Sequence, residues 1–366
     1  MGKILQGNCL DVLKTLDSES VNMCVTSPPY YGLRDYGTGT WVGGNPDCPH
    51  RRMNKYSEST ITGHAQEELR GNVGDAIYKT VCPLCGAVRE DMQVGLEETP
   101  EEYIDRLVNI FREVKRVMKD DGTLWVNIGD SYAGNSSRGT KLQGNPEFNK
   151  NRPLRELTLL PKKSVPSSCK PKDLIGIPWM LAFALRADGW YLRQDIIWQK
   201  VNPMPESVED RCTKSHEYLF LFAKNPKYYF DYESIQEPCV SDLNNSNIRF
   251  GGTKYGDNSD SRFTIYSGNT WRPTAKRRKR DVWTVPPANL KEAHFAVMPE
   301  RLVEPCILAG CPKGGVVLDP FFGSGTTGVV SKKLRRDYVG VELNTEYVEM
   351  AKNRIDHTYV QYKLFD

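Results

Sequence analysis

The chain has 366 residues, of which 39% are hydrophobic and 26% charged, and its formal net charge is +3. This composition fits one large soluble domain, or a domain with a small satellite, and excludes a membrane protein because no apolar run approaches roughly 20 residues. The small net charge does not by itself indicate nucleic-acid binding, so local charge clusters have to be considered. The start of the chain, 1–5, lacks a signal-peptide pattern, and we therefore expect a cytoplasmic protein.

The first elements predict a β-α-β unit. Short apolar runs over 3–7 and 21–26 have the composition of buried strands, and 11–16 between them has helical spacing. The stretch 36–98 that follows is rich in glycine, asparagine and other polar residues, and it contains most of the close cysteine and histidine pairs. We expect this stretch to be an insertion into the domain.

Helices and strands alternate again after the insertion, which predicts an α/β fold with helices on both faces of a parallel or mixed sheet. Thr99 and Pro100 are typical of a helix start. The predicted elements are helix 99–118, strand 123–128, helix 173–187, strand 191–198, strand 216–222, helix 299–308, strand 315–319, a helix ending near 334, strand 338–342 and a helix ending near 355.

Two long segments, 131–172 and 236–281, are polar and show no periodicity. Loops of this length inside a compact domain usually have a function or are disordered. We therefore divide the chain into three parts: a catalytic core, an insertion and two target-recognition loops. The core is 1–35, 99–130, 173–235 and 282–366, the insertion is 36–98, and the loops are 131–172 and 236–281.

A glycine turn separates the predicted strand 315–319 from the next helix. It reads Asp-Pro-Phe-Phe-Gly-Ser-Gly-Thr-Thr from Asp319, and glycines let the backbone turn tightly while a ligand approaches. Glu342 lies 19 positions after Gly323, where an acid can bind ribose hydroxyls. The Walker lysine and the dinucleotide spacing are both absent, so another adenosine-containing cofactor is favoured over ATP or NAD. The alternative is a tight turn without a ligand.

A second turn, Ser27-Pro-Pro-Tyr30, ends the strand 21–26. Two successive prolines stiffen the backbone and remove two donors, so the turn presents carbonyls and the flanking side chains. An aromatic amine is a poor nucleophile, and acceptors aimed at its hydrogens stabilise the positive charge that grows as it attacks a sulfonium methyl. Ser27 and the Pro28 carbonyl can be those acceptors, and Tyr30 can stack on a flipped base. Taken alone, such a turn is more often a rigid loop without a catalytic role.

Together the two turns resemble those of the β-class DNA amino-methyltransferases of restriction-modification systems and phages, in which the catalytic turn also precedes the cofactor turn. The resemblance covers roughly 1–35, 99–130 and 173–366. It implies a Rossmann-like S-adenosylmethionine-dependent methyltransferase sheet and a site-specific enzyme that flips its target base out of double-stranded DNA. Serine at the first position resembles the cytosine-N4 enzymes, and adenine-N6 stays open because aspartate or asparagine is only the more usual residue there.

The resemblance also implies roles for individual residues. The catalytic residues are Ser27, Pro28, Pro29 and Tyr30. The cofactor-binding residues are Asp11, Thr26, His294, Phe295, Pro299, Asp319, Phe321, Gly323, Gly325, Thr326 and Glu342. Among these, Asp11 resembles an acid near the adenine, whereas the residues themselves equally allow a helix cap. His294 equally fits a structural histidine in a loop.

Two cysteine pairs in the insertion indicate a metal site. Cys82-Pro-Leu-Cys85-Gly has the form of a zinc knuckle, and Cys48-Pro-His50 lies 34 positions before Cys82. The Cys-x-His spacing is tighter than usual, and free thiols are the alternative. We expect a structural zinc held by Cys48, His50, Cys82 and Cys85.

Five consecutive cations lie in the second long loop, namely Lys276, Arg277, Arg278, Lys279 and Arg280. Such runs are usually solvated, but beside a methyltransferase core we expect them to contact DNA phosphates. Double-stranded DNA is thus the expected partner, with a cognate restriction endonuclease and a second copy of the chain as further candidates. The competing functions are a non-catalytic zinc-containing nucleic-acid-binding protein and methylation of RNA or of a protein glutamine.

Overall fold

The computed structural model describes residues 2–32, 38–52, 76–77, 81–134, 165–203, 205–206, 208–239, 276–288 and 297–359. Their main feature is an eight-stranded sheet of order β1-β14-β13-β2-β7-β9-β8-β12. Its strands are β1 Lys3–Gln6, β2 Val21–Thr26, β7 Met118–Ile128, β8 Tyr191–Gln199, β9 His216–Ala223, β12 Val282–Thr284, β13 Val316–Asp319 and β14 Asp337–Glu342. All neighbouring pairs are parallel except those that β9 makes with β7 and β8.

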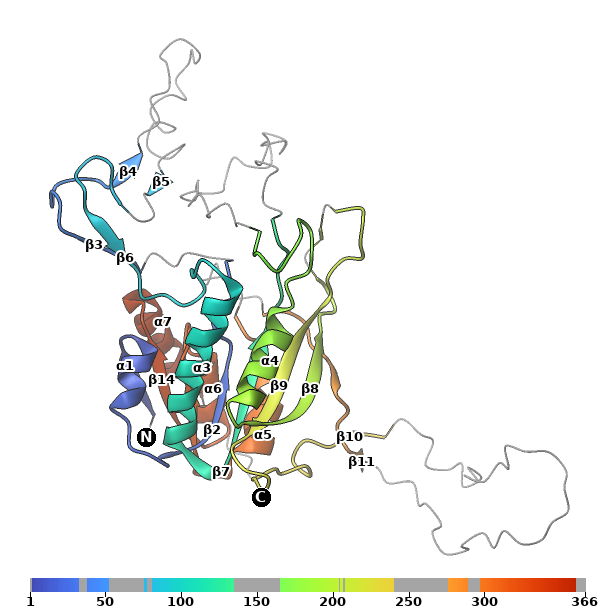
Figure 1. Cartoon of the computed structure of the whole chain (residues 1–366). Helices are drawn as coiled ribbons and strands as arrows, with labels where there is room; N and C mark the ends of the chain where they lie inside the picture. The colour runs from blue at the N-terminus through green and yellow to red at the C-terminus, as the bar shows by residue number, and fades with distance from the viewer. Residues whose placement is uncertain are drawn as a thin grey trace, which may run out of the picture.

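Helices cover both faces of this sheet, as predicted (Figure 1). They are α1 Cys9–Lys14, α3 Pro100–Val117, α4 Ile177–Ala187, α5 Glu300–Gly310, α6 Thr326–Lys333 and α7 Thr345–Asp356. Side chains of β2 alternate between the faces: Cys24 packs with α1, α3 and α4, whereas Met23 and Val25 pack with α5. This alternation follows from the two-residue period of a strand. In the described part of the chain, no helix is long and apolar enough to cross a membrane.

Three two-stranded sheets lie outside the main sheet. They are β3 Thr40–Val42 with β6 Val88–Glu90, β4 Arg51–Arg52 with β5 Ala76–Ile77, and β10 Glu237–Pro238 with β11 Lys276–Arg277. The first two lie beyond the carboxyl ends of β2 and β7, and the third lies at the opposite end of the sheet (Figure 1). Most of the predicted recognition loops, 135–164 and 240–275, fall outside the described residues.

Helix boundaries follow the capping residues. The α3 helix begins with a capping box in which Thr99 accepts from the Glu102 amide and Glu102 accepts from the Thr99 amide. The α4 helix begins at Ile177 and not at the predicted 173, because the Asp130 carboxylate accepts the amides of Gly176 and Ile177 at 3.0 and 3.1 Å. A side chain distant in sequence thus sets this helix start.

Candidate active site

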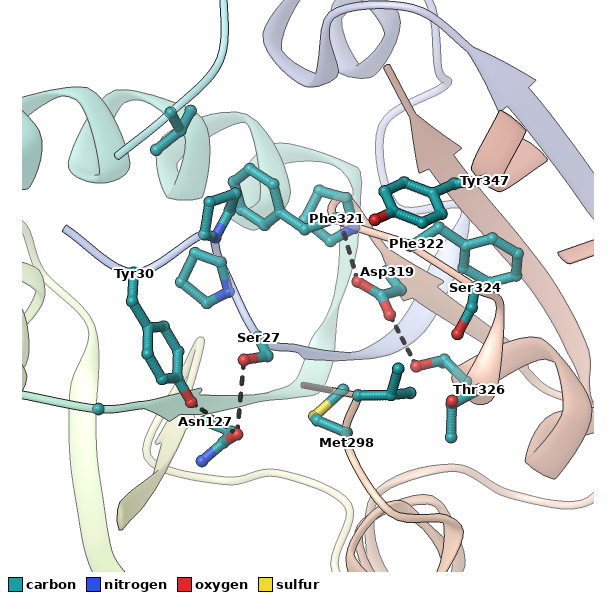
Figure 2. A pocket seen from close by; sticks show the side chains of 18 of the residues that line it. Ser27, Tyr30, Asn127, Met298, Asp319, Phe321, Phe322, Ser324, Thr326 and Tyr347 are labelled. Atoms are coloured by element: carbon teal, nitrogen blue, oxygen red, sulfur yellow. Dashed lines mark hydrogen bonds between the residues drawn. The ribbon is translucent and has the colours of Figure 1, made fainter. Parts of the chain in front are cut away.

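A cavity of about 530 Å³ opens where β2, β7, β13 and β14 end, and the two turns singled out from the sequence line it together. Ser27 to Tyr30 form one part of the wall, and Phe321 to Ser324 with Thr326 form another (Figure 2). The turns are nearly 300 positions apart in sequence but follow neighbouring parallel strands, whose carboxyl ends meet at one edge. The fold therefore joins them into one site.

Asp319 ties the two turns to each other. Its carboxylate accepts from the Thr26 hydroxyl at 2.6 Å, the Phe321 amide at 3.1 Å and the Thr327 hydroxyl at 2.7 Å. Burial raises the pKa of Asp319 to about 6, because the charged form loses its hydration. Thr26 itself is fully buried and does not line the cavity, so its role here is to hold the turns together.

The glycine turn is bent by two residues in the left-handed region. Gly323 has φ 51° and Gly325 has φ 80°. A Cβ on Gly325 would lie 2.7 Å from the Ala351 Cβ, whereas a Cβ on Gly323 would meet nothing within 4 Å. Gly325 is therefore required by packing against α7, and Gly323 by its backbone conformation at the cavity wall.

Glu342, the last residue of β14, lies directly beside this turn. Its carboxylate accepts the Gly323 amide at 2.7 Å and the Asn344 amide at 2.8 Å. Burial raises the pKa of Glu342, while these two amide hydrogen bonds oppose the rise. The acid is thus held in a defined position at the cavity, whose wall also includes the aromatic side chains of Phe321 and Tyr347 (Figure 2). A cavity with one fixed acid, aromatic walls and a glycine turn fits the adenosine part of a cofactor.

The Ser27 and Tyr30 hydroxyls both lie within hydrogen-bond distance of one acceptor, Asn127 Oδ1 near the end of β7. Their hydroxyls lie 3.4 and 3.2 Å from Asn127 Oδ1. The Asn127 amide nitrogen donates to Glu217 at 3.3 Å and to the Tyr218 carbonyl at 3.1 Å, which places the oxygen toward the turn. Since the Ser27 proton is directed at Asn127, the lone pairs of Ser27 are available as acceptors at the cavity.

Glu217 and Lys200 complete this polar network. Glu217 Oε2 accepts from the Tyr30 hydroxyl at 2.6 Å, and Lys200 Nζ lies 2.5 Å from Glu217 Oε1. Burial, followed by the charge of Glu217, raises the pKa of Tyr30 well above its usual value, so Tyr30 stays a neutral donor. The Tyr30 ring packs on Gly129, where a Cβ would lie 2.6 Å from the ring.

No sequence motif marks Asn127, Glu217 or Lys200 as residues of the site. Polar residues at the ends of apolar strands are a weak signal: Asn127 interrupts the run Leu124–Ile128, and Glu217 precedes Tyr218–Phe222. Their convergence requires the antiparallel pairing of β7 and β9, in which Asn127 lies opposite Leu219.

Several expected cofactor residues are placed differently. Asp11 lies exposed in the first turn of α1 and is not among the residues lining the cavity; Asn8 accepts from the amides of Leu10 and Asp11 and is the cap, so the interpretation of Asp11 as a cap was wrong. Asn8 and Cys9 line the cavity instead. Pro299 is buried at the start of α5, one residue beyond Met298, which lines the cavity. His294 and Phe295 lie outside the described residues.

The four expected metal ligands converge. Ligand atoms of Cys48, His50, Cys82 and Cys85 all lie within 4.8 Å of one another. The Cys48 and Cys82 sulfurs are 3.7 Å apart, and Cys85 Sγ is 3.5 Å from His50 Nδ1. A tetrahedral zinc with ordinary bond lengths has edges of about 3.8 Å between two sulfurs and about 3.5 Å between sulfur and nitrogen. The donor set and its spacing therefore fit zinc.

The basic run begins in β11 and ends just before β12. The strand β11 lies at the end of the sheet opposite the cavity (Figure 1), whereas β12 pairs with Ile197–Gln199 at the carboxyl end of β8. Arg277 and Arg280 both pair with Glu237, at 2.9 and 2.8 Å. That the run contacts DNA phosphates stays a prediction. The cations that do line the cavity are Lys200 and Lys214.

The family model described as DNA methylase matches residues 21–353. The type II methyltransferase M.Cfr9I of Citrobacter freundii is 41% identical over 352 residues, which are 96% of this chain and 87% of that protein. The type II methyltransferase M.SmaI of Serratia marcescens is 40% identical over 353 residues, which are 96% and 90% of the two chains.

Two solved structures share the fold. The PvuII DNA methyltransferase, described as cytosine-N4-specific, has a TM-score of 0.54 at 15% identity, covering 99% of this chain and 88% of that one. A putative DNA modification methylase from Thermus thermophilus, complexed with S-adenosyl-L-methionine, has a TM-score of 0.50 at 18% identity, covering 99% and 96%.

Proposed function

Because this chain belongs to the DNA methylase family, we propose that it transfers a methyl group from S-adenosylmethionine to the exocyclic N4 of a cytosine flipped out of double-stranded DNA. The observation that carries the proposal is the shared cavity, which the Ser27 turn and the Gly323 turn line together. A cofactor against one turn and a base amine at the other would have their reacting atoms in the same enclosed space.

S-adenosylmethionine supplies an electrophilic methyl group on a sulfonium. The residues that would hold it are Glu342 at the ribose, Asn8 and Cys9 at the start of α1, and the turn from Phe321 to Thr326. Gly323 leaves the backbone open to a close ligand, since nothing lies within 4 Å of the position that its Cβ would occupy. Asp319 keeps this turn adjacent to the catalytic one through its bonds to Thr26 and Thr327.

Ser27 acts as the acceptor for the attacking amine. Its proton is donated to Asn127, which leaves its lone pairs for a hydrogen of the amine. An acceptor in this position localises the nitrogen lone pair and stabilises the positive charge that develops on the nitrogen. Glu217 and Lys200 hold Asn127 and Tyr30 in place, so that the acceptor is already oriented when the base arrives.

Cytosine N4 is favoured over adenine N6 by the serine at position 27, through its resemblance to the cytosine enzymes. Both bases present an amine beside a ring nitrogen, and the acceptor geometry serves either. Adenine N6 is therefore the alternative target of the same mechanism.

We further propose that Cys48, His50, Cys82 and Cys85 hold one structural zinc ion. The support is the donor set and the 3.7 and 3.5 Å edges between its members. Double-stranded DNA is the proposed substrate, and a cognate restriction endonuclease the proposed partner, since M.Cfr9I and M.SmaI are both named type II methyltransferases.

Incubation of the purified protein with duplex DNA and methyl-labelled S-adenosylmethionine, followed by nucleoside mass spectrometry, tests the function. We expect N4-methylcytosine from the wild type and from a Ser20→Ala control, and a strongly reduced yield from Ser27→Ala. Product that carries N6-methyladenine alone would reassign the base, and absence of any methylated nucleoside would refute the proposal.

A further inference from the structure

We propose that the metal held by Cys48, His50, Cys82 and Cys85 keeps the catalytic turn in one conformation. The metal closes an arm of the chain, and the end of this arm packs against the turn. The arm is defined as residues 38–52 and 81–95. The inference rests on the proposed zinc site and extends the proposed function from the metal to the geometry of catalysis. Its basis is a continuous series of short contacts from the metal ligands to Ser27–Tyr30.

The metal would cross-link the outer ends of two short strands. Cys48 and His50 follow β3, Cys82 and Cys85 precede β6, and β3 pairs with β6 over only three residues each. The Trp41 ring of β3 stacks on the His50 ring with centroids 4.4 Å apart. Two such strands are not stable in water alone, so the metal would supply the free energy that keeps them paired.

Asp91 forms the foot of the arm. Its carboxylate accepts from the Thr38 hydroxyl at 2.9 Å and from the Gln93 amide at 3.0 Å, and it pairs with Arg89 of β6 at 3.0 Å. The Arg89 and Asp91 side chains are only 8% and 12% exposed, so solvent screens this pair weakly. Thr38 and Gln93 both line the cavity, which places the foot in the wall of the site.

Residues 93–97, which follow Asp91, are hydrogen-bonded to α3 and to Gly32, two residues beyond the catalytic turn. Arg106 of α3 donates to the Gln93 carbonyl at 3.1 Å and to Glu97 at 2.9 Å. The Gly32 amide donates to the Gly95 carbonyl at 2.7 Å. A Cβ on Gly95 would lie 3.0 Å from the Tyr30 carbonyl oxygen and 3.2 Å from the Pro29 carbonyl oxygen, so this segment packs closely against the turn.

Loss of the metal would separate the two chain segments of the arm and release the foot. The hydrogen bond from the Thr38 hydroxyl to Asp91 joins these segments, and without the metal cross-link it would have to form against the entropy of closing a longer open loop. The Gly95 packing that supports Pro29 and Tyr30 would loosen with them. The cofactor turn is held by other residues, Asp319 and Glu342.

Hydrogen exchange on the full-length protein tests this inference at three amides with defined partners: Gln93, Gly95 and Gly32. The samples are zinc-loaded wild type, wild type stripped by a chelator under reducing conditions, and Cys85→Ser. We expect about tenfold faster exchange at these amides without metal, since the opening free energy of a local unit falls. The Phe322 and Gly323 amides should be unchanged, and turnover should fall together with the faster exchange.

Two variants separate coupling from mere unfolding of the arm. Asp91→Ala should retain about one equivalent of zinc by elemental analysis, yet show the faster exchange at Gly95 and Gly32. Cys212→Ser, at an exposed cysteine outside the arm, should behave as the wild type.

Faster exchange confined to the Cys48, Cys82 and Gly86 amides, with Gly95 and Gly32 unchanged, would overturn the coupling while leaving the zinc site intact. A metal-free purified protein with a fully protected arm would overturn both metal proposals. Neither result depends on the methylated product, which tests the enzyme function separately.

Discussion

Replacement of Ser27 by alanine is the most direct test of the acceptor role, because the change should affect the rate far more than the fold. Ser27 is partly buried, and its hydroxyl donates to Asn127 over a long distance of 3.4 Å. Such a bond contributes only about 0.5–1.5 kcal/mol, so we expect a loss of stability at the lower end of that range. In the transition state, by contrast, the hydroxyl would face a developing positive charge.

Loss of one preorganised group at a developing charge costs about 10²–10³ in turnover in comparable sites, or about 2.7–4 kcal/mol. We therefore expect Ser27→Ala to slow single-turnover methylation by roughly that factor, with S-adenosylmethionine affinity by calorimetry close to that of the wild type. Urea denaturation measures the stability of the same samples, and Ser20→Ala is the control for a hydroxyl lost near β2.

A double-mutant cycle would measure how far Asn127 acts through Ser27. If Asn127 acts by directing the Ser27 proton, Asn127→Ala should slow the wild type strongly but add little to Ser27→Ala. Full additivity of the two effects, or a Ser27→Ala rate within about threefold of the wild type at saturating cofactor and DNA, would refute the assignment of Ser27 as an oriented acceptor.

Further predictions concern the base, the cofactor, the metal and the pH dependence. Tyr30→Ala should raise the KM for DNA more than the dissociation constant for cofactor, as a stacking contact of about 1–3 kcal/mol is lost; equal changes in both would contradict this role. Gly323→Trp and Glu342→Ala should weaken S-adenosylmethionine binding in calorimetry, and unchanged affinity in both would remove the cofactor from this turn. Elemental analysis should find about one zinc per chain, and Cys82→Ser should abolish it while Cys212→Ser retains it. The Asp319 pKa of about 6 lies above the usual value of 3.8, so the folded state binds this proton more tightly than the unfolded state does. The contribution of Asp319 to the free energy of unfolding should therefore fall by about 3 kcal/mol as the pH rises from about 4 to 6. Urea denaturation across this range should show a flatter pH profile for Asp319→Asn than for the wild type, and identical profiles would rule out Asp319 as the source.

The parts of the site that could be predicted from the sequence are those determined by local chemistry. Two prolines after a strand stiffen the chain whatever its surroundings, and two closely spaced glycines after a strand predict a tight turn. The alternation of apolar runs likewise predicted the helices and strands of the core, and close cysteine and histidine pairs identified four groups that do converge.

The tertiary structure decided what depends on which strands become neighbours. The antiparallel pairing of β7 with β9 brings Asn127, Glu217 and Tyr30 together, and no local pattern encodes that pairing. The structure also places β11, in which the run Lys276–Arg280 begins, at the end of the sheet opposite the cavity, a position that the charge run alone does not reveal. Sequence patterns report what each segment can do, whereas the energy of packing a whole sheet determines which segments act together.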